Sequence, residues 1–83
     1  MTSYIHLNEL RVGERAVVER VDAPTGGAQG GMRRRLLDLG LTPCAEVECV
    51  GKSPFGDPAS YRIRGAIVAI RARDGRSVLI RRG

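Results

Sequence analysis

The clearest pattern of hydrophobic and polar positions lies near the middle of the chain. At about 100° per residue, Met32, Leu36 and Leu39 fall within one narrow stripe, which is the i, i+4, i+7 spacing of a helix face packed against a core. Gly40 follows the last turn and can take the positive φ with which many helices end. Pro43 then prevents the helix from restarting. The pattern predicts a short amphipathic helix with a defined end.

Alternation with a period of two predicts strands on the C-terminal side of this helix. Val47 and Cys49 alternate with glutamates, so one face of that segment is apolar and the other acidic. Tyr61 and Ile63 alternate with arginines in the same way. Both segments are therefore expected to be half-buried strands, the second with a basic outer face.

Three further strands complete the expected sheet. Residues 15–21 are rich in valine, although two adjacent valines blur the alternation. Residues 66–70 are apolar at every position, which predicts a central strand covered on both sides. Val78 and Ile80 face the core from a last strand. Five short strands, with one helix inserted between the first and the second, predict an all-β fold and a small antiparallel barrel, because closure removes exposed edges.

Glycine and proline mark the connections. Residues 22–31 form a glycine-rich connector into the helix, and they lack both common phosphate-binding glycine motifs. Residues 52–58 form a turn-rich loop that presents Phe55 beside Gly56. In this loop Phe55 is either a lid on the barrel end or an exposed anchor. Gly65 marks a bend or bulge between two strands.

Several of these segments together resemble the FeoA family, the small cytoplasmic accessory proteins of bacterial ferrous iron uptake. The similar residues are RLLDLGLTP at 35–43, EVE at 46–48, KSPFGDP at 52–58 and YRIRG at 61–65. The resemblance covers nearly the whole chain in order. It implies a single SH3-like barrel domain over residues 1–83 and a role in ferrous iron transport. At the level of the family, it also implies transition metal ion binding.

The chain departs from the family pattern at one position and leaves one connection open. Relatives usually have glycine where this chain has Cys44, so the turn after Pro43 either tolerates a side chain or is strained. Asp74 and Gly75 are typical of a tight turn, whereas the family usually has a short helical turn at residues 71–76.

Length and charge limit the function classes. The chain has 83 residues and no apolar run of the roughly 20 residues that a membrane span needs, which favours a cytoplasmic protein without direct membrane insertion. Its net charge of +5 comes from thirteen arginines and one lysine. A basic surface favours an acidic protein, an anionic membrane surface or nucleic acid as partner.

The resemblance implies that the partner is FeoB, a membrane ferrous iron transporter with a cytoplasmic GTP-binding domain. We therefore expect peripheral association with the inner membrane through this partner. The alternative is a basic nucleic-acid-binding module, although three scattered aromatic residues make a poor base-stacking platform. A second alternative is a regulatory domain like the barrels of metal-dependent repressors, but no helix-turn-helix precedes this one.

Few residues are candidates for catalysis or metal binding. His6 is the only histidine, and no carboxylates have the spacing of an acid/base pair. Cys44 and Cys49 would lie on opposite faces of a strand, which argues against a disulfide or a shared metal. We therefore predict no enzyme activity, no metal site and no cofactor.

The candidate partner-binding residues are basic or apolar. The arginines at 33–35 spread over about 200° of helix, so only Arg34, with Leu37 beside the apolar stripe, is expected to reach a partner. The interpretation favoured for the run as a whole is a solvated face, with the outer two arginines laying their stems over the apolar stripe. Arg62 and Arg64 share the outer face of one strand and form a basic stripe. The full set of candidate partner-binding residues is Arg34, Leu37, Phe55, Arg62 and Arg64.

The predicted helix can be tested by placing a charge in its apolar stripe. A Leu36→Asp or Leu39→Asp change should abolish cooperative folding, because an unpaired buried carboxylate costs several kcal/mol in a domain stable by only about 5–15 kcal/mol. Thermal unfolding followed by circular dichroism measures this. A cooperative, native-like melt in either variant would refute the helix placement.

Overall fold

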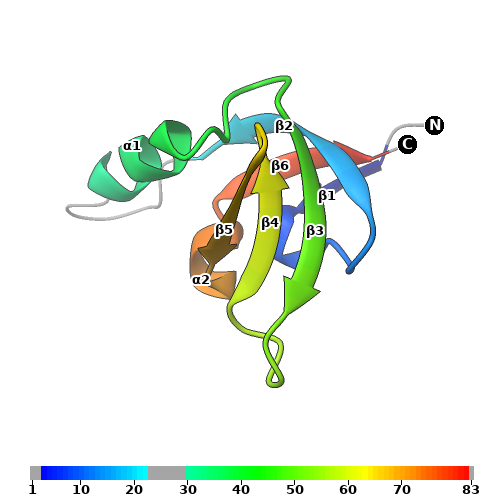
Figure 1. Ribbon diagram of the computed structural model, residues 1–83. Helices are drawn as coiled ribbons and strands as arrows, with labels where there is room; N and C mark the ends of the chain where they lie inside the picture. Colours follow the sequence, from blue (N-terminus) through cyan, green and yellow to red (C-terminus); the bar gives the residue numbers. More distant parts are fainter. Residues whose placement is uncertain (1–2, 23–29, 83) are drawn as a thin grey trace.

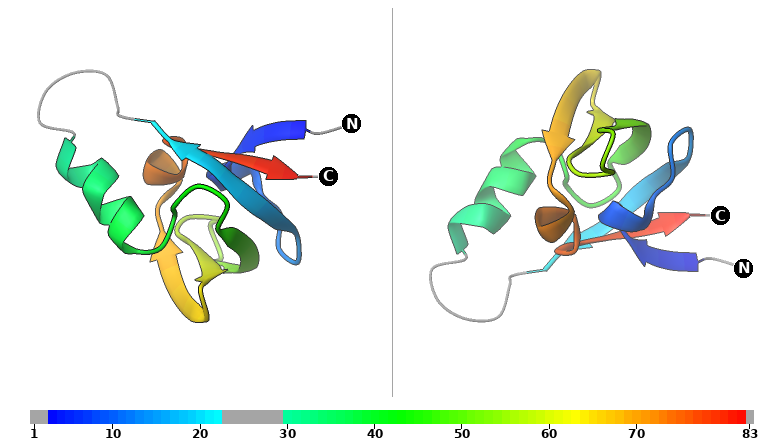
Figure 2. Two further views of the ribbon diagram at one scale, coloured as in Figure 1. Left: turned by 90° about the horizontal axis from the view of Figure 1, so that it is seen from above. Right: turned by 90° about the horizontal axis from the view of Figure 1, so that it is seen from below.

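A computed structural model describes residues 3–22 and 30–82, with side chains from residue 34 onward in the second segment. The described chain forms one six-stranded sheet in the order β1-β6-β2-β3-β4-β5, with every neighbouring pair antiparallel. The sheet curls around the core, and the helix α1 lies to one side, beyond β5 (Figures 1 and 2). The elements are β1 Ser3–His6, the 3-10 helix η1 Leu7–Glu9, β2 Arg15–Val21, α1 Gly30–Asp38, β3 Glu46–Lys52, β4 Ala59–Ile63, β5 Ala66–Ile70, α2 Ala72–Gly75 and β6 Val78–Arg82.

The core is built from the alternating positions that the sequence indicates. In β3, Val47 and Cys49 are buried, and in β6 Val78 and Ile80 are fully buried. In β2 the register shifts between Val18 and Arg20, which marks a β-bulge. The bulge changes the spacing of buried residues from two, between Ala16 and Val18, to three, between Val18 and Val21. The buried apolar residues are Leu7, Leu10, Ala16, Val18, Val21, Leu36, Leu41, Ala45, Val47, Cys49, Ala59, Tyr61, Ile63, Ile70, Val78 and Ile80.

The two shortest helices lie against each other across the end of the barrel near the β3–β4 loop. Gly75 of α2 lies so close to η1 that an added Cβ would be 3.0 Å from the Asn8 backbone nitrogen. The Tyr61 hydroxyl donates a hydrogen bond to the Leu7 carbonyl oxygen over 3.3 Å. The Ala72 N–H donates to Asp57 Oδ1 over 2.9 Å, which ties the β3–β4 loop to α2. These contacts join segments that lie far apart in the sequence.

Helix α1 ends as the sequence predicts. Gly40 has a φ of +106°. Its N–H donates to the Leu37 carbonyl, and the Leu41 N–H donates to the Leu36 carbonyl. This pair of bonds is a Schellman motif, which satisfies the last carbonyls of a helix. Leu36 is buried and Leu39 half-buried against the core, so the predicted apolar stripe is confirmed at these two positions. The side chain of Met32 lies outside the described residues.

The turn after α1 is of type II. The Ala45 N–H donates to the Thr42 carbonyl, and Pro43 and Cys44 occupy the two central positions. Cys44 has a φ of +72°, the left-handed conformation that a type II turn requires at this position. Cys44 therefore takes the strained left-handed conformation of the usual glycine, and the chain does not adopt another turn type.

Several expectations are corrected. Residues 66–70 form an edge strand instead of a central one: β5 pairs with β4 alone among the described strands, and Ile67 is 60% exposed. The pattern was misleading because an all-apolar run does not reveal whether a neighbour covers it. The sheet has six strands instead of five, since Ser3–His6 pairs with β6. Among the described strands, β1 and β5 do not pair with each other, so the sheet is not closed edge to edge, while the expected all-β class is confirmed.

Two helix boundaries also differ from simple expectations. Asp74 and Gly75 belong to the short helix α2 rather than to a tight turn, as the family resemblance implies. Helix α1 begins at Gly30, within the expected connector 22–31, the rest of which lies mostly outside the described residues. No helix of the described segments has the length and apolar character to cross a membrane.

The strain at Cys44 is testable. A Cys44→Gly change should raise the free energy of unfolding by about 0.5–1 kcal/mol relative to Cys44→Ala. The left-handed conformation costs a residue with a Cβ about 1–2 kcal/mol, and part of this gain is offset because glycine loses more backbone entropy on folding. Urea unfolding of both variants measures the difference. Equal stability of the two variants would show that the turn carries no such strain.

Candidate partner-binding surface

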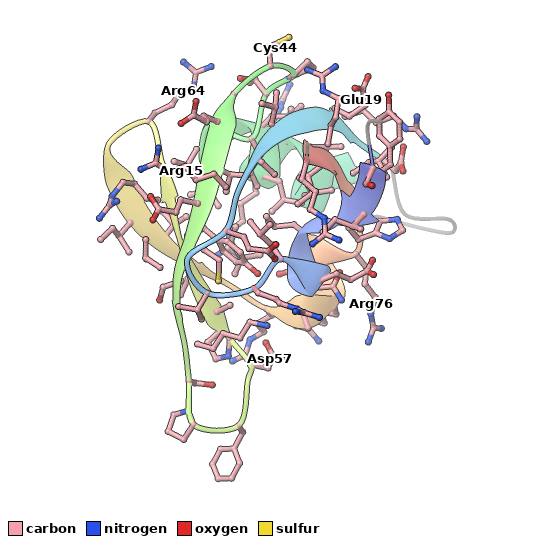
Figure 3. The ribbon with its side chains drawn as sticks, turned by 90° about the vertical axis from the view of Figure 1, so that its right-hand side faces the viewer. Arg15, Glu19, Cys44, Asp57, Arg64 and Arg76 are labelled. Atoms are coloured by element: carbon pink, nitrogen blue, oxygen red, sulfur yellow. The ribbon has the colours of Figure 1, made fainter. Side chains whose placement is uncertain are left out.

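Arg62 and Arg64 line a pocket of about 330 Å³ at the end of the sheet where β4 turns into β5. Arg15 from β2 lies on the same side of the molecule as Arg64 (Figure 3). We call this site the arginine pocket; its lining residues are Arg15, Glu46, Val47, Glu48, Arg62, Arg64 and Gly65. Arg62 lies on β4, whereas Arg64 lies in the turn that follows, so the predicted stripe on one strand face is instead part of a concave site to which three strands contribute.

Glu48 holds two of the three arginines. Its Oε1 lies 3.1 Å from a terminal nitrogen of Arg62 and 3.6 Å from Nε of Arg15. The three residues are neighbours across β2, β3 and β4, because Arg15 pairs with Glu48 and Glu48 with Arg62 in the sheet register. Exposed ion pairs of this kind stabilise a fold by at most about 1 kcal/mol. Their main effect is to orient the two guanidinium groups.

Arg64 occupies a backbone conformation that arginine rarely adopts. Its φ is +50° and that of Gly65 is +82°, so the two residues form the two-residue type I′ turn between β4 and β5. Such turns favour asparagine or glycine at the first position. The Arg64 guanidinium donates to Thr42 Oγ1 over 2.7 Å and, from Nε, to the Gly40 carbonyl over 3.5 Å. An arginine held in a strained position at a surface pocket points to a role other than turn formation.

The pocket carries a positive excess. It holds three guanidinium groups and two carboxylates, and among the described side chains Glu48 is the carboxylate that forms ion pairs within the pocket. Guanidinium groups bind carboxylate and phosphate oxygens with paired, charge-assisted hydrogen bonds. The arrangement therefore suits an acidic group on a partner.

Phe55 is exposed and does not form a lid on the barrel end. It is 96% exposed in the β3–β4 loop, at the opposite end of β4 from the arginine pocket (Figure 1). The loop is closed by a bond from the Gly56 N–H to the Ser53 carbonyl, and Gly56 has a φ of +82°. Since Asp57 is bonded to α2, the exposed ring stands on an anchored loop. Exposed aromatic residues on ordered elements are common at protein interfaces.

The five candidate residues do not form one surface. A strand rises about 3.3 Å per residue, so the first and last residues of the five-residue β4 lie roughly 13 Å apart. This separation places Phe55 well away from Arg62 and Arg64. Arg34 is exposed on α1, but Leu37 is half-buried and packs against the core. Leu37 therefore has a structural role at this position.

Sequence reasoning missed Arg15 and Glu48, which complete the arginine pocket. Alternation correctly placed Glu48 on the outer face of its strand. The signal that was lacking is the sheet register, which brings Arg15, Glu48 and Arg62 into line. Register depends on which strands pair, and a single alternating segment does not specify its neighbour.

The candidate metal ligands lie apart in the described structure. Cys49 is fully buried, with its Sγ 3.7 Å from the Gly51 carbonyl oxygen, while Cys44 is exposed. His6 interacts with Glu9, whose carboxylate accepts a hydrogen bond from the His6 backbone N–H over 3.0 Å. Within residues 3–22 and 30–82, no three side chains of histidine, cysteine, aspartate or glutamate are grouped to hold a metal ion.

The fold and this surface define a small SH3-like barrel with a charged surface pocket. The chain belongs to the FeoA family, because the FeoA domain model matches residues 5–82. It is similar to the solution structure of a FeoA-like protein from Clostridium acetobutylicum, with a TM-score of 0.80, 30% identity, and coverage of 96% of this chain and 87% of the other.

Two further relatives carry functional descriptions. Stenotrophomonas maltophilia FeoA, solved in complex with zinc, is described as a prokaryotic SH3 domain protein with a suggested role as a ferrous iron transport activating factor; its TM-score is 0.79 at 30% identity, covering 92% of this chain and 88% of that one. A Porphyromonas gingivalis protein that fuses Fe(2+) transport protein A to the transporter FeoB is 31% identical over 74 residues, or 89% of this chain. The present chain spans only 8% of that fusion protein.

The buried Tyr61 makes stability sensitive to alkaline pH. Burial raises the pKa of Tyr61 from 10.0 to about 12, with smaller contributions from Cys49 and Asp57. Below pH 10 both folded and unfolded states keep the proton. Between pH 10 and 12 the unfolded state loses it first, so the free energy of unfolding should fall by about 1.4 kcal/mol per pH unit, to a total of about 2–3 kcal/mol. Denaturant unfolding at pH 9 and pH 11.5 measures this loss.

The control for this prediction is Tyr61→Phe, which keeps the ring but has no ionisable hydroxyl. It should lose the hydrogen bond to Leu7 and show a smaller decrease of stability over the same pH range. An identical decrease in both proteins would assign the alkaline transition to other groups.

Proposed function

We propose that this chain is a non-enzymatic accessory protein of ferrous iron uptake, which binds the cytoplasmic GTP-binding part of a FeoB-type transporter. The supporting observation is the Porphyromonas gingivalis fusion, in which a similar domain shares one polypeptide with FeoB. Fusion holds two domains at high effective concentration. We infer that the domain of the present chain binds the transporter through its own surface.

The arginine pocket and Phe55 are the proposed contacts. Arg62 and Arg64 would bind carboxylates of the transporter, and the Phe55 ring would enter an apolar depression on it. Because these two contacts lie at opposite ends of β4, one partner that bridges them must follow the full length of this strand. Arg34 on α1 would contribute a peripheral charge.

Regulation requires the chain to bind two transporter states with different affinities, since equal binding would shift nothing. The domain supplies two contacts at opposite ends of β4, so it would favour the transporter conformation that presents both complementary sites at the matching distance. Iron would then be handled by the transporter, while this chain contributes binding. In this proposal the chain lies at the cytoplasmic face of the membrane through its partner.

Affinity for the transporter tests this surface. The triple variant Phe55→Ser, Arg62→Glu, Arg64→Glu should bind the detergent-solubilised FeoB-type transporter of the same host at least tenfold more weakly, because an exposed anchor and two charge pairs are removed. Binding is measured by biolayer interferometry with nuclease present. Circular dichroism verifies that the variant is folded.

A matched control changes the same kinds of residues elsewhere. The variant Arg11→Glu, Val12→Ser, Arg20→Glu has the same change in net charge and also loses an exposed apolar side chain, since Val12 is 57% exposed. It should retain the affinity of the unmodified chain within about twofold. Equal affinity of both triple variants would refute the proposed contact surface. If the tagged chain captures only nucleic-acid-associated proteins from its host, the basic-module alternative would be favoured.

A further inference from the structure

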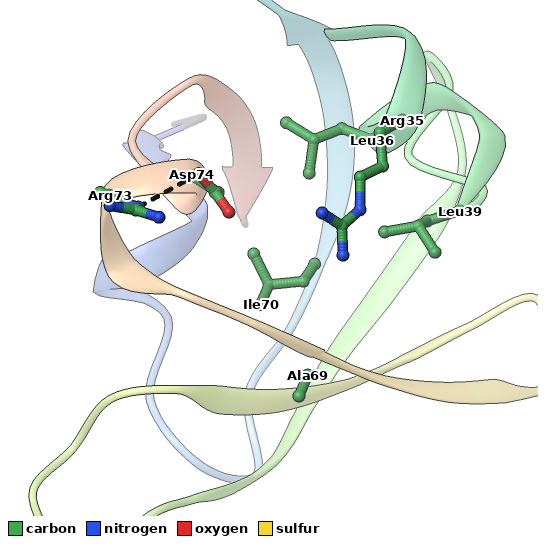
Figure 4. Close-up of a pocket in the computed structure, with 7 residues that line it drawn as sticks. All are labelled: Arg35, Leu36, Leu39, Ala69, Ile70, Arg73 and Asp74. Carbon is green, nitrogen blue, oxygen red and sulfur yellow. Dashed lines mark ion pairs between the residues drawn. The ribbon is translucent and has the colours of Figure 1, made fainter. Parts of the chain in front are cut away.

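A second pocket, of about 350 Å³, lies between α1 and the edge strand β5 (Figure 4). Leu36 and Leu39 form its wall on the α1 side, and Ala69 and Ile70 form the opposite wall. Arg35 projects from α1 towards this opposite wall in Figure 4. We call this site the α1–β5 pocket. It is separate from the arginine pocket, which uses β2, β3 and the far end of β4.

The backbone beside this pocket has unused hydrogen-bonding groups. In the type I′ turn at residues 64–65, the flanking residues Ile63 and Ala66 form a hydrogen-bonded pair. Hydrogen-bonded and non-hydrogen-bonded pairs alternate along antiparallel strands. Ile67 and Ala69 therefore direct their N–H and C=O groups away from β4, towards an edge on which no described strand lies.

The same edge presents apolar side chains. Ile67 and Ala69 lie two residues apart and so share one face of β5; Ile67 is 60% exposed, and Ala69 lines the α1–β5 pocket. Open edges with apolar side chains promote strand pairing, and proteins usually protect them with charges, prolines or a covering element. Within β5 itself there is no charged residue and no proline. The edge is therefore suited to accept a strand.

The charges around the pocket select the partner. Arg73 is 77% exposed on its side chain, and its Nε lies 3.9 Å from Asp74 Oδ1, so this pair is loose. Arg71, at the start of α2, and Arg34, on α1, are also exposed. A second copy of the chain paired along β5 would bring two such sets of arginines together, and their repulsion opposes self-association. An acidic partner would be attracted.

We propose that the α1–β5 pocket binds an extended, acidic segment of a partner protein as an additional strand on β5. The segment would pair with the outward backbone groups of Ile67 and Ala69 and place an apolar side chain between Leu39 and Ile70. Its acidic side chains would bind Arg35 and Arg73. In strand addition of this kind, main-chain hydrogen bonds supply the affinity, and the side chains at alternate positions supply the specificity. If this segment belongs to the transporter, that part of the proposal rests on the proposed function. The addition of a strand to β5 does not.

The probe is a display library of 16-residue peptides that tile the proteins of the host, selected on the full chain. Enriched peptides are synthesised, and their affinity is measured by calorimetry. They should alternate apolar and acidic residues, and they should bind the variant Arg35→Glu, Arg73→Glu at least tenfold more weakly. The control Arg11→Glu, Arg20→Glu has the same net charge and should change affinity by no more than about twofold.

A backbone variant tests the strand pairing. Ala69→Pro removes one outward N–H donor and should weaken binding to a similar degree; in the unmodified chain, the amides of Ile67 and Ala69 should become protected from hydrogen exchange when peptide binds. If Ala69→Pro does not fold, the peptide affinity of the Arg35→Glu, Arg73→Glu variant tests the proposal in its place. The proposal is overturned if no peptide is enriched, if binding is unaffected by the arginine variant, or if the chain dimerises through β5.

The outcome is distinguishable from that of the proposed function. Failure of the unmodified chain to bind the transporter would refute the proposed function, while peptide binding at β5 would still stand. Conversely, a transporter that binds the chain while no peptide is enriched would support the proposed function and refute the α1–β5 pocket as a strand-binding site.

Discussion

The close approach of Gly40 to the end of β4 is the constraint on which both surface sites depend. A Cβ at this position would lie 2.9 Å from Cγ2 of Ile63 and 3.2 Å from Cδ of Arg64, and the φ of +106° is itself unfavourable for other residues. The glycine therefore ends α1 directly against the β4–β5 turn. This contact places α1 beside β5, which creates one wall of the α1–β5 pocket, and lets the Gly40 carbonyl accept a bond from Arg64.

Arg64 connects this packing to the surface chemistry. The residue is held in a left-handed turn by bonds to Thr42 and Gly40, while its neighbours Arg15 and Arg62 are oriented by Glu48. Preorganised guanidinium groups lose less side-chain entropy on binding than free ones. The three arginines thus line one pocket with partly oriented guanidinium groups, which is the basis for the proposed binding of an acidic partner.

The open sheet gives the domain a second kind of binding capacity. A closed barrel would use every backbone group internally, whereas here β5 keeps one edge without a described strand beside it. The two pockets lie on different sides of the β4–β5 hairpin and have different chemistry. The arginine pocket offers charge alone, while the α1–β5 pocket combines charge with apolar walls and backbone groups. A partner could use both without competition between the sites.

Local sequence was sufficient for the elements that depend on local physics. The apolar stripe at Leu36 and Leu39, the helix end at Gly40 and the alternation in β3 and β4 were all predictable, because helix period, glycine conformation and strand pleat are properties of short segments. The strained Cys44 turn was one of the two alternatives that the family pattern indicated. Tertiary structure alone decided that β5 is an edge, that Arg15 and Glu48 join Arg62, and that Phe55 is exposed. The first two depend on which strands pair and in what register, and the third depends on how the β3–β4 loop is held against α2. Such long-range contacts are not encoded in the pattern of any one strand.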